Sequence, residues 1–180
     1  VVRLKSGDPL VFGRGGEEAE YLAAEGIPFE IVPGITAAAG CAAAAGIPMT
    51  HRDVSSSVTF LAGHEADGKG KTGIDWKRLP ADGTIAVYMG VARAEGLARD
   101  LMEKANIPAD TPVVVVENGT LRTQRVLRGR LAGLSRLMKE AGVRSPALLF
   151  VGKTAACALT GHPRKENTEE RNDGPVAKSG

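Results

Sequence analysis

The 180-residue sequence predicts an α/β fold with two domains, the first of which is incomplete. Short apolar runs alternate with helix-like segments along the chain, which is typical of strands joined by helices. The alternation restarts after residues 49–53, which we interpret as a linker. The chain begins on Val1, inside an apolar run and without an initiator methionine, so we expect a piece of a longer protein. We assign 1–52 to the C-terminal part of the first domain, 53–159 to the second domain and 160–180 to a tail.

The first 46 residues predict a strand, a helix, a second strand and a second helix. The strand over 1–4 stops at Gly7-Asp8-Pro9, and another glycine-rich turn over 13–16 opens the first helix. Glycine turns after a strand let backbone approach a ligand with no side chain in between. The second helix is rich in alanine, so we expect another element to pack very close to it. The helices are expected over 17–25, with Tyr21 and Leu22 facing inward, and over 36–45, and the second strand over 27–32.

The second domain predicts five strands and two helices. The apolar run at 113–116 is typical of a strand covered on both faces. Asn118-Gly119 is a turn signal, from which 124–131 returns as a hairpin strand. A loop over 63–73, rich in Gly and Lys, is expected to be exposed and mobile, and the polar tail from about residue 160 to be disordered. Further strands are expected over 57–61, 84–89 and 147–151, and helices over 93–105 and 134–141.

Composition limits the partners that this chain can have. Hydrophobic residues make up 43% and charged residues 24% of the chain, which is typical of a globular protein. An aromatic content of 4% argues against single-stranded nucleic acid, which binds on aromatic stacking platforms. Cys41 and Cys157 lie far apart without metal-ligand spacing, so we expect two reduced thiols in a cytoplasmic protein and assign no metal ligand. No apolar run nears the roughly 20 residues that span a bilayer, so no membrane contact is expected.

Several blocks of sequence occur together in one order: the opening run VVRLKSGDPLVFGRGGEE, then VPGITAAAGCAAAAGIPMTHRD, TFLAGH, YMG, VENGT and SPALLFVG. Over residues 1–151 these blocks resemble the uroporphyrinogen-III C-methyltransferases of the tetrapyrrole methylase family. The resemblance implies two α/β domains with S-adenosylmethionine in the cleft between them, and a homodimer. It also implies transfer of two methyl groups to ring carbons of uroporphyrinogen III, giving precorrin-2 for siroheme and cobalamin biosynthesis.

Two departures from the family pattern matter. Ser6 stands where the family usually has glycine, and it would be strained only if this position needs a positive φ. The family's N-terminal Gly/Pro-rich loop and its acid/base residues lie upstream of Val1, so the catalytic residues are unknown here. We therefore expect this chain alone to turn over weakly or not at all. Methyl transfer to an electron-rich pyrrole carbon mainly requires orientation and exclusion of water, so no nucleophilic triad is expected.

The resemblance places cofactor contacts at four points along the chain. At the first turn, main-chain groups and the Asp8 carboxylate meet the polar part of the cofactor; a plain turn is the alternative. Val11 is an apolar contact or an ordinary core residue, and Thr36 is a contact that can also cap the following helix. Met89 faces the adenosine or fills the core, and Gly119 is a backbone contact or part of a hairpin turn. The complete set is Ser6, Gly7, Asp8, Val11, Thr36, Ala37, Met89 and Gly119.

The implied substrate carries eight carboxylates, so a basic rim is expected around the site. Basic residues in or beside the matched blocks can pair with these acids, arginine in bidentate fashion. They are Arg3, Lys5, Arg14, His51 and Arg52. A second basic stretch over 122–130 is interpreted as the solvated face of a hairpin. His64 either faces the cleft or is a loop histidine without a catalytic part, and His162 in the tail is assigned no role.

Two other functions stay open beside uroporphyrinogen III methylation. One is a methylase of the same fold that acts on another corrin precursor, although the blocks GDPLVFGRGGEE and GIPMTHRD favour the uroporphyrinogen branch. The other is a non-catalytic fragment that folds and binds cofactor or tetrapyrrole only weakly. A dinucleotide-binding module is rejected, because Gly13-Arg14-Gly15-Gly16 lacks the G-x-G-x-x-G spacing.

Overall fold

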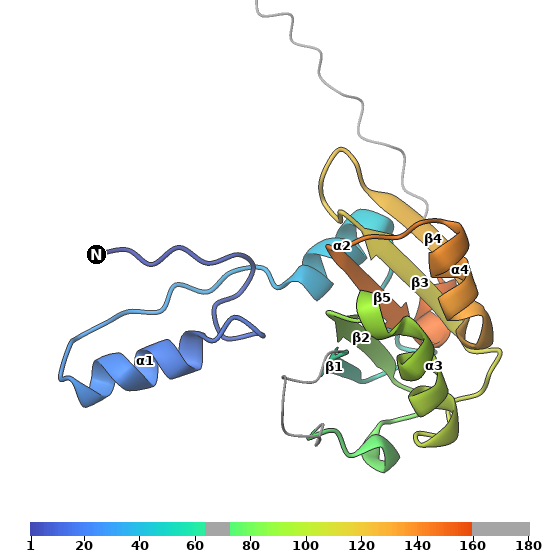
Figure 1. The fold of residues 1–180 in the computed structure, drawn as a ribbon, viewed down its shortest axis with the longest axis horizontal. Coiled ribbons are helices and arrows are strands. Elements are labelled where there is room, and N and C mark those ends of the chain that lie inside the picture. Colours follow the sequence, from blue (N-terminus) through green and yellow to red (C-terminus); the bar gives the residue numbers. More distant parts are fainter. Residues whose placement is uncertain (64–72, 160–180) are drawn as a thin grey trace, which may run out of the picture.

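The computed structural model describes residues 1–63 and 73–159, which form a sheet-containing body and an N-terminal arm (Figure 1). The loop and tail predicted over 63–73 and 160–180, together with His64 and His162, lie almost entirely outside the described residues. In the described part of the chain, no helix is long and apolar enough to cross a bilayer.

The body contains one sheet of five strands in the order β1-β2-β5-β3-β4. Strands β1 and β2 run parallel, whereas the other three neighbouring pairs are antiparallel. The strands are β1 (Val58–Ala62), β2 (Thr84–Tyr88), β3 (Pro112–Glu117), β4 (Arg125–Arg130) and β5 (Ala147–Val151). The sequence predicts all five of them, with bounds that differ by one residue or less at each end. The fold class is α/β, as predicted.

Helices cover both faces of the sheet (Figure 1). Helices α3 (Ala94–Glu103) and α4 (Leu134–Glu140) pack on one face, where Val113 and Val115 are fully buried. Helix α2 (Ala37–Ala45) packs on the other face against Val114 and Val116. The run at 113–116 is therefore covered on both faces, as its unbroken apolar character predicts. Short 3₁₀ turns complete the body at Trp76–Arg78, Val91–Arg93, Leu131–Gly133 and Lys153–Ala156.

Helix α2 lies very close to the sheet, as its small side chains predict. Ala38, Cys41 and Ala42 are buried against the sheet, together with Ala86 and Phe150. The helix ends at Gly46, whose φ of 64° is the left-handed conformation that glycine adopts without strain at a helix C-terminus.

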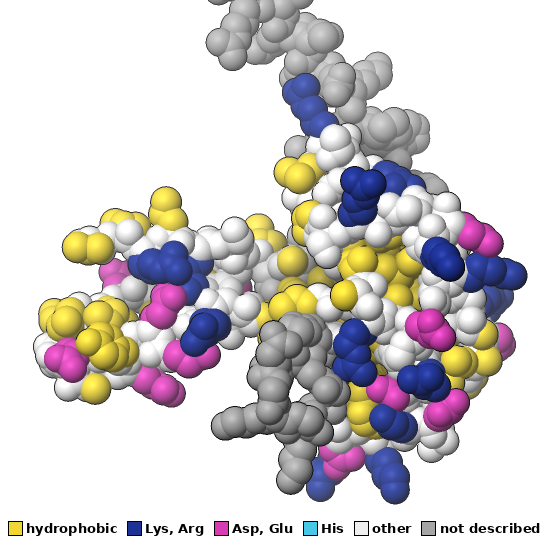
Figure 2. Space-filling model, in the orientation of Figure 1, with side chains coloured by type: hydrophobic (Ala, Val, Ile, Leu, Met, Phe, Trp, Pro, Cys, Tyr) yellow, Lys and Arg dark blue, Asp and Glu magenta, His cyan; other side chains and the backbone are white. Residues whose placement is uncertain are grey.

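The arm differs from the prediction. Helix α1 (Gly15–Ala24) forms where a helix is expected, but residues 1–4 and 27–32 form no strand. A strand needs a neighbour that pairs with its backbone, and in the described part of the chain neither segment has one. Their apolar side chains are exposed instead, as Figure 2 shows on the arm. Tyr21, expected to face inward, has 67% of its surface exposed because the sheet does not reach this helix.

Candidate functional site

The C-terminal ends of strands β1, β2 and β3 lie at one edge of the sheet. Ala62 pairs with Tyr88 at the end of the parallel pair, and Glu117 pairs with the first residue of β5, Ala147. The chain leaves this edge through Gly63, Met89 and Asn118, and the Gly63 amide donates to the Tyr88 carbonyl at 2.7 Å. In open α/β sheets this edge is where ligands bind.

The Tyr88 side chain joins this edge to the start of helix α2. Its hydroxyl accepts a hydrogen bond from the Ala38 amide at 3.0 Å and lies 2.6 Å from Thr36 Oγ1. Thr36 occupies the N-cap position, but its side chain makes no capping bond to the helix. The prediction that the Thr36 hydroxyl caps α2 is therefore wrong, because the Tyr88 hydroxyl takes that place. The sequence gives one signal for this role: a tyrosine at the end of a buried strand needs a partner for its hydroxyl.

Aromatic rings connect the first glycine-rich loop to the same edge. The Phe12 ring lies 4.8 Å from the Tyr88 ring, centroid to centroid, and the Phe60 ring of β1 lies 5.8 Å from it, edge to face. Val11, next to Phe12, packs half-buried against the core on the α2 side of the sheet. Contacts of residues far apart in the sequence thus hold the loop against the sheet edge.

The Asp8 carboxylate links two loops through hydrogen bonds. Its Oδ1 accepts from the Leu10 amide at 2.9 Å, and its Oδ2 accepts from the Gly34 amide at 3.1 Å. A Cβ at Gly34 would collide with the Gly7 carbonyl oxygen, so the two backbones touch where only glycine fits. The positive φ in this turn, 70°, belongs to Gly7, and Ser6 is not among the positive-φ residues. The serine therefore causes no backbone strain at position 6.

Gly119 lies directly against the middle of helix α2. A Cβ on Gly119 would collide with the Cys41 sulfur, and one on Gly40 would lie 3.4 Å from Thr120 Cγ2. Gly119 itself is not among the positive-φ residues, whereas its neighbours Asn118 and Thr120 have φ of 50° and 70°. Close approach of the helix therefore explains the glycine better than a tight turn does.

Residues with a strained, left-handed backbone conformation are concentrated in the loops around this edge. The described chain has six non-glycine residues with positive φ, and five of them lie in these loops: Phe12, Arg14, Met89, Asn118 and Thr120. Such conformations cost free energy and concentrate at functional sites. The Met89 side chain is 51% exposed, which disfavours the alternative that it only fills the core. Figure 2 shows hydrophobic side chains at the junction of the arm and the body.

The structure therefore brings together the four predicted cofactor-contact regions. The turn of Ser6, Gly7 and Asp8 meets Gly34, just before Thr36 and Ala37 at the start of α2. Tyr88, beside Met89, bonds to that same start, and Gly119 lies against the helix at Cys41, a little over one turn further along. Cys41 was not assigned at the sequence level, because no local pattern indicates that its sulfur faces Gly119.

The predicted substrate cations of the arm are paired with acids of helix α1. Lys5 Nζ lies 2.8 Å and Arg3 Nη2 lies 3.4 Å from Glu18 Oε1, and Arg14 Nε lies 3.3 Å from Glu17 Oε1. Hydrogen bonding to Lys5, with a smaller contribution from Arg3, holds the pKa of the Glu18 carboxyl below its usual value. The remaining two, His51 and Arg52, lie in an exposed turn before β1, where the His51 amide bonds to the Ser55 carbonyl at 2.9 Å.

The second basic stretch is exposed, as predicted, since Arg125, Arg128 and Arg130 of β4 all lie at the surface, but these arginines also make hydrogen bonds. Arg125 donates to Glu117 Oε2 and to the Ala141 carbonyl, both at 2.8 Å. Arg128 donates to the Ala155 carbonyl at 2.9 Å and Arg130 to the Asp110 carbonyl at 2.6 Å. These guanidinium groups join the edge strand β4 to the end of α4, to the last 3₁₀ turn and to the loop before β3.

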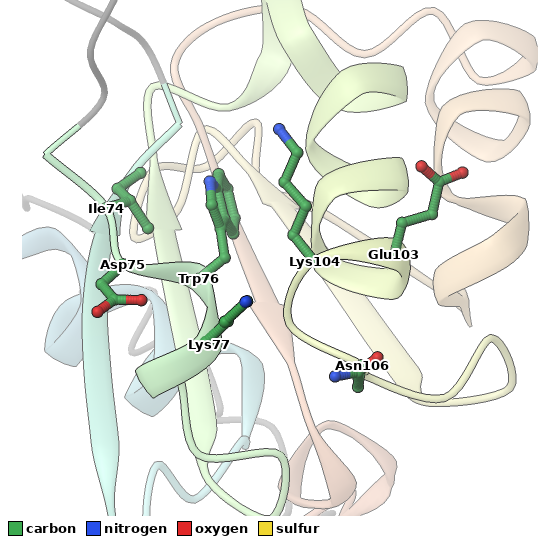
Figure 3. Close-up of a pocket in the computed structure, with 7 residues that line it drawn as sticks. All are labelled: Ile74, Asp75, Trp76, Lys77, Glu103, Lys104 and Asn106. Carbon is green, nitrogen blue, oxygen red and sulfur yellow. The ribbon is translucent and has the colours of Figure 1, made fainter.

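A hollow of about 400 Å³ lies elsewhere, between the first 3₁₀ turn and the end of α3 (Figure 3). Lys104 Nζ lies 5.9 Å from the Trp76 ring centroid and 2.8 Å from Asp100. The charged ends in Figure 3 do not converge on a point, and none of the predicted site residues lines the hollow. Its lining consists of Ile74, Asp75, Trp76, Lys77, Glu103, Lys104 and Asn106. We therefore place the candidate site at the sheet edge.

Comparison with known proteins shows the family of this chain. The family model "Tetrapyrrole (Corrin/Porphyrin) Methylases" matches residues 1–135, three quarters of the chain. The chain belongs to the tetrapyrrole methylase family. The match extends through all the site regions of this methylase chain, from the Asp8 turn to Gly119.

Named relatives lie within the same family. The S-adenosyl-L-methionine-dependent uroporphyrinogen III methyltransferase of Methanosarcina barkeri is 53% identical over 84% of the methylase chain and 60% of its own length. A siroheme synthase of Pseudomonas fluorescens is 51% identical over 85% of the chain and 32% of its own length. The crystal structure of uroporphyrin-III C-methyl transferase from Thermus thermophilus, complexed with S-adenyl homocysteine, is 35% identical with a TM-score of 0.71, covering 86% of the chain and 63% of its own. The chain thus spans from a third to under two thirds of the length of these relatives.

Proposed function

We propose that the protein containing this chain is an S-adenosylmethionine-dependent C-methyltransferase that converts uroporphyrinogen III to precorrin-2. The observation that carries the proposal is the meeting of the Asp8 turn, the start of α2, Met89 and Gly119 at one sheet edge. The 53% identity to a relative named for uroporphyrinogen III favours this substrate over another corrin precursor. The product feeds the biosynthesis of siroheme and cobalamin.

The residues at this edge suit S-adenosylmethionine. Glycines keep the backbone open where a polar ligand needs main-chain partners, and the positive end of α2 lies beside them. Exposed apolar side chains, among them Met89 and Ile35, offer a surface for an adenine ring. We assign the contacts to Ser6, Gly7, Asp8, Val11, Thr36, Ala37, Met89 and Gly119. When bound, S-adenosylmethionine supplies an activated methyl group, and these residues orient it and exclude water.

We assign the carboxylates of the substrate to Arg3, Lys5, Arg14, His51 and Arg52. Of the three arm cations, Arg3 and Arg14 have side chains 70% and 82% exposed, so their guanidinium groups can donate to a second carboxylate. Lys5 has a side chain only 12% exposed and is held by Glu18. We therefore infer that, among the arm cations, Arg3 and Arg14 contribute most to substrate affinity, whereas Lys5 mainly stabilises the conformation of the arm.

Calorimetric titration with S-adenosylhomocysteine tests the cofactor assignment on this chain. We expect micromolar binding, and we expect Met89→Ala to weaken it about tenfold, because half of the Met89 side chain is free to contact a ligand. Val126→Ala on edge strand β4 is the matched control, an exposed apolar side chain away from the site. Equal weakening by both variants, or no binding by the unmodified chain, would contradict the assignment. Turnover with uroporphyrinogen III is then measured on the whole protein.

We further propose that the whole protein is a cytoplasmic homodimer. The family resemblance supports the dimer, as do the apolar side chains exposed on the arm, such as Val32 and Ile27. Two free cysteines, Cys41 and Cys157, support a reducing compartment. Light scattering of the whole protein at the mass of one protomer would contradict the dimer, and its recovery in a membrane or secreted fraction would contradict the compartment.

A further inference from the structure

The side chain of Gln124 bridges two parts of the candidate site. Its Oε1 accepts a hydrogen bond from the Thr120 amide at 2.7 Å, directly after Gly119. Its Nε2 donates to the Ala44 carbonyl, in the last turn of helix α2, at 3.3 Å. One amide side chain therefore joins the loop after β3 to the helix that begins at Thr36 and Ala37.

The loop and the helix need such a bridge because their atoms are already in close contact, so a small shift of either would disturb the packing. Gly119 has no room for a Cβ beside Cys41, and Thr120 lies against Gly40 with a left-handed φ of 70°. A strained loop keeps this conformation only if its surroundings hold it. Among side chains, only Asn and Gln carry an amide that can accept and donate at once, and Gln has the longer reach.

We propose that Gln124 is a positioning residue that holds the Gly119 loop against helix α2 and so sets the spacing of two cofactor contacts. This inference rests on the proposed function for its ligand, S-adenosylmethionine. Gln124 itself touches neither the reacting atoms nor the predicted contact residues' side chains, and it acts through the Thr120 amide.

Arg128 provides a matched control. It lies four residues further along, in strand β4, and like Gln124 it bonds to a carbonyl at the end of α2. Its guanidinium donates to the Ala45 carbonyl at 3.4 Å and to the Ala155 carbonyl at 2.9 Å. Arg128 thus holds the same helix end as Gln124 but, among the described residues, makes no hydrogen bond to the Gly119 loop, so a variant separates helix anchoring from loop positioning.

The test compares Gln124→Leu, Gln124→Glu and Arg128→Met in titrations with S-adenosylhomocysteine and in amide hydrogen exchange at Thr120. We expect Gln124→Leu to weaken binding about tenfold and to expose the Thr120 amide, since the loop loses its acceptor. Gln124→Glu keeps the acceptor for the Thr120 amide but loses the donor to the Ala44 carbonyl, so Thr120 stays protected while binding weakens less than in Gln124→Leu. Arg128→Met lowers the unfolding temperature but leaves binding within about twofold.

Each result bears on the proposal. Unchanged binding in Gln124→Leu, equal losses in Gln124→Leu and Arg128→Met, or a Thr120 amide as exposed in Gln124→Glu as in Gln124→Leu would overturn it. If the unmodified chain binds no S-adenosylhomocysteine, the proposed function fails. Hydrogen exchange then tests the Gln124 bridge by itself. Faster exchange of the Thr120 amide in Gln124→Leu but not in Arg128→Met supports the bridge, and equal protection of that amide in both variants refutes it.

Discussion

The Tyr88 hydroxyl lies 3.0 Å from the backbone nitrogen of Ala38 and takes the place of a local cap on helix α2. The first amides of a helix lack partners within it, and a side chain usually supplies one from the N-cap residue. Here the partner comes from the end of strand β2, fifty residues away in the sequence. The start of the helix is therefore placed by the sheet, together with Thr36 and Ala37.

Tyr88→Phe should destabilise the body without disturbing its aromatic packing. The variant keeps the ring that Phe12 and Phe60 contact, but it removes the hydroxyl that serves Thr36 and Ala38. We expect the free energy of unfolding to fall by about 1–2 kcal/mol in urea titrations, the range for a lost cap and a buried amide left unpaired. Tyr21→Phe, on the exposed face of the arm, is the control and should change nothing measurable. A loss no larger than that of the control would show that the hydroxyl does not cap the helix.

Gly119→Ala should destabilise the chain through its contact with Cys41. The added methyl group collides with the sulfur, which costs about 1–3 kcal/mol as overpacking does in other cores. Cys41→Ala removes that sulfur. In the Cys41→Ala background, Gly119→Ala should therefore lower the free energy of unfolding by less, and a double-mutant cycle measures the difference as a coupling energy. Gly16→Ala is the control, because a Cβ there meets no atom within 4 Å and the residue lies in helix α1. Additive losses in the cycle would mean that the two residues do not press on each other.

Cys41 and Cys157 should react at very different rates with iodoacetamide. Burial raises the pKa of the Cys41 thiol above its ordinary value, so the reactive thiolate is scarce at neutral pH, and the sulfur is also covered. Cys157 is partly exposed and should be labelled first. Peptide mass spectrometry over time distinguishes the sites, and Cys157→Ser should leave a protein that labels only slowly until denaturant is added. Rapid labelling of Cys41 in the folded chain would contradict its burial beneath the loop.

The Glu18 carboxyl should titrate below the usual range for glutamate. Hydrogen bonding to Lys5 is the main cause, and Arg3 adds attraction, so the folded-state pKa is lowered from 4.5. The sign follows from linkage: a lowered carboxyl pKa contributes stability that is present above 4.5 and lost as pH falls through the lower folded value. Carbon-detected NMR titration measures this midpoint. Lys5→Met should raise it more than Arg3→Met does, and equal midpoints in all three proteins would rule out the pairing.

Much of the sheet could be predicted from local pattern, but the arm could not. The runs at 113–116 and 147–151 carry enough apolar character to form strands wherever they pack, and both do. The runs at 1–4 and 27–32 are mainly apolar, although Arg3, Pro28 and Glu30 interrupt them, and they form no strand, since no neighbouring strand pairs with them in the described chain. The domain division at residue 52 stays a prediction.

For the candidate site too, some features could be predicted from the sequence and others could not. The sequence by itself determined where the glycine turns, the alanine-rich helix and the strand ends lie, because these depend on neighbours within a few residues. Only the tertiary structure decided that the Tyr88 hydroxyl caps α2, that Gly119 lies on Cys41 and that Gln124 joins a loop to a helix. Hydrogen bonds and close contacts of this kind join residues 50 to 80 positions apart, and no local pattern encodes which partner a side chain meets.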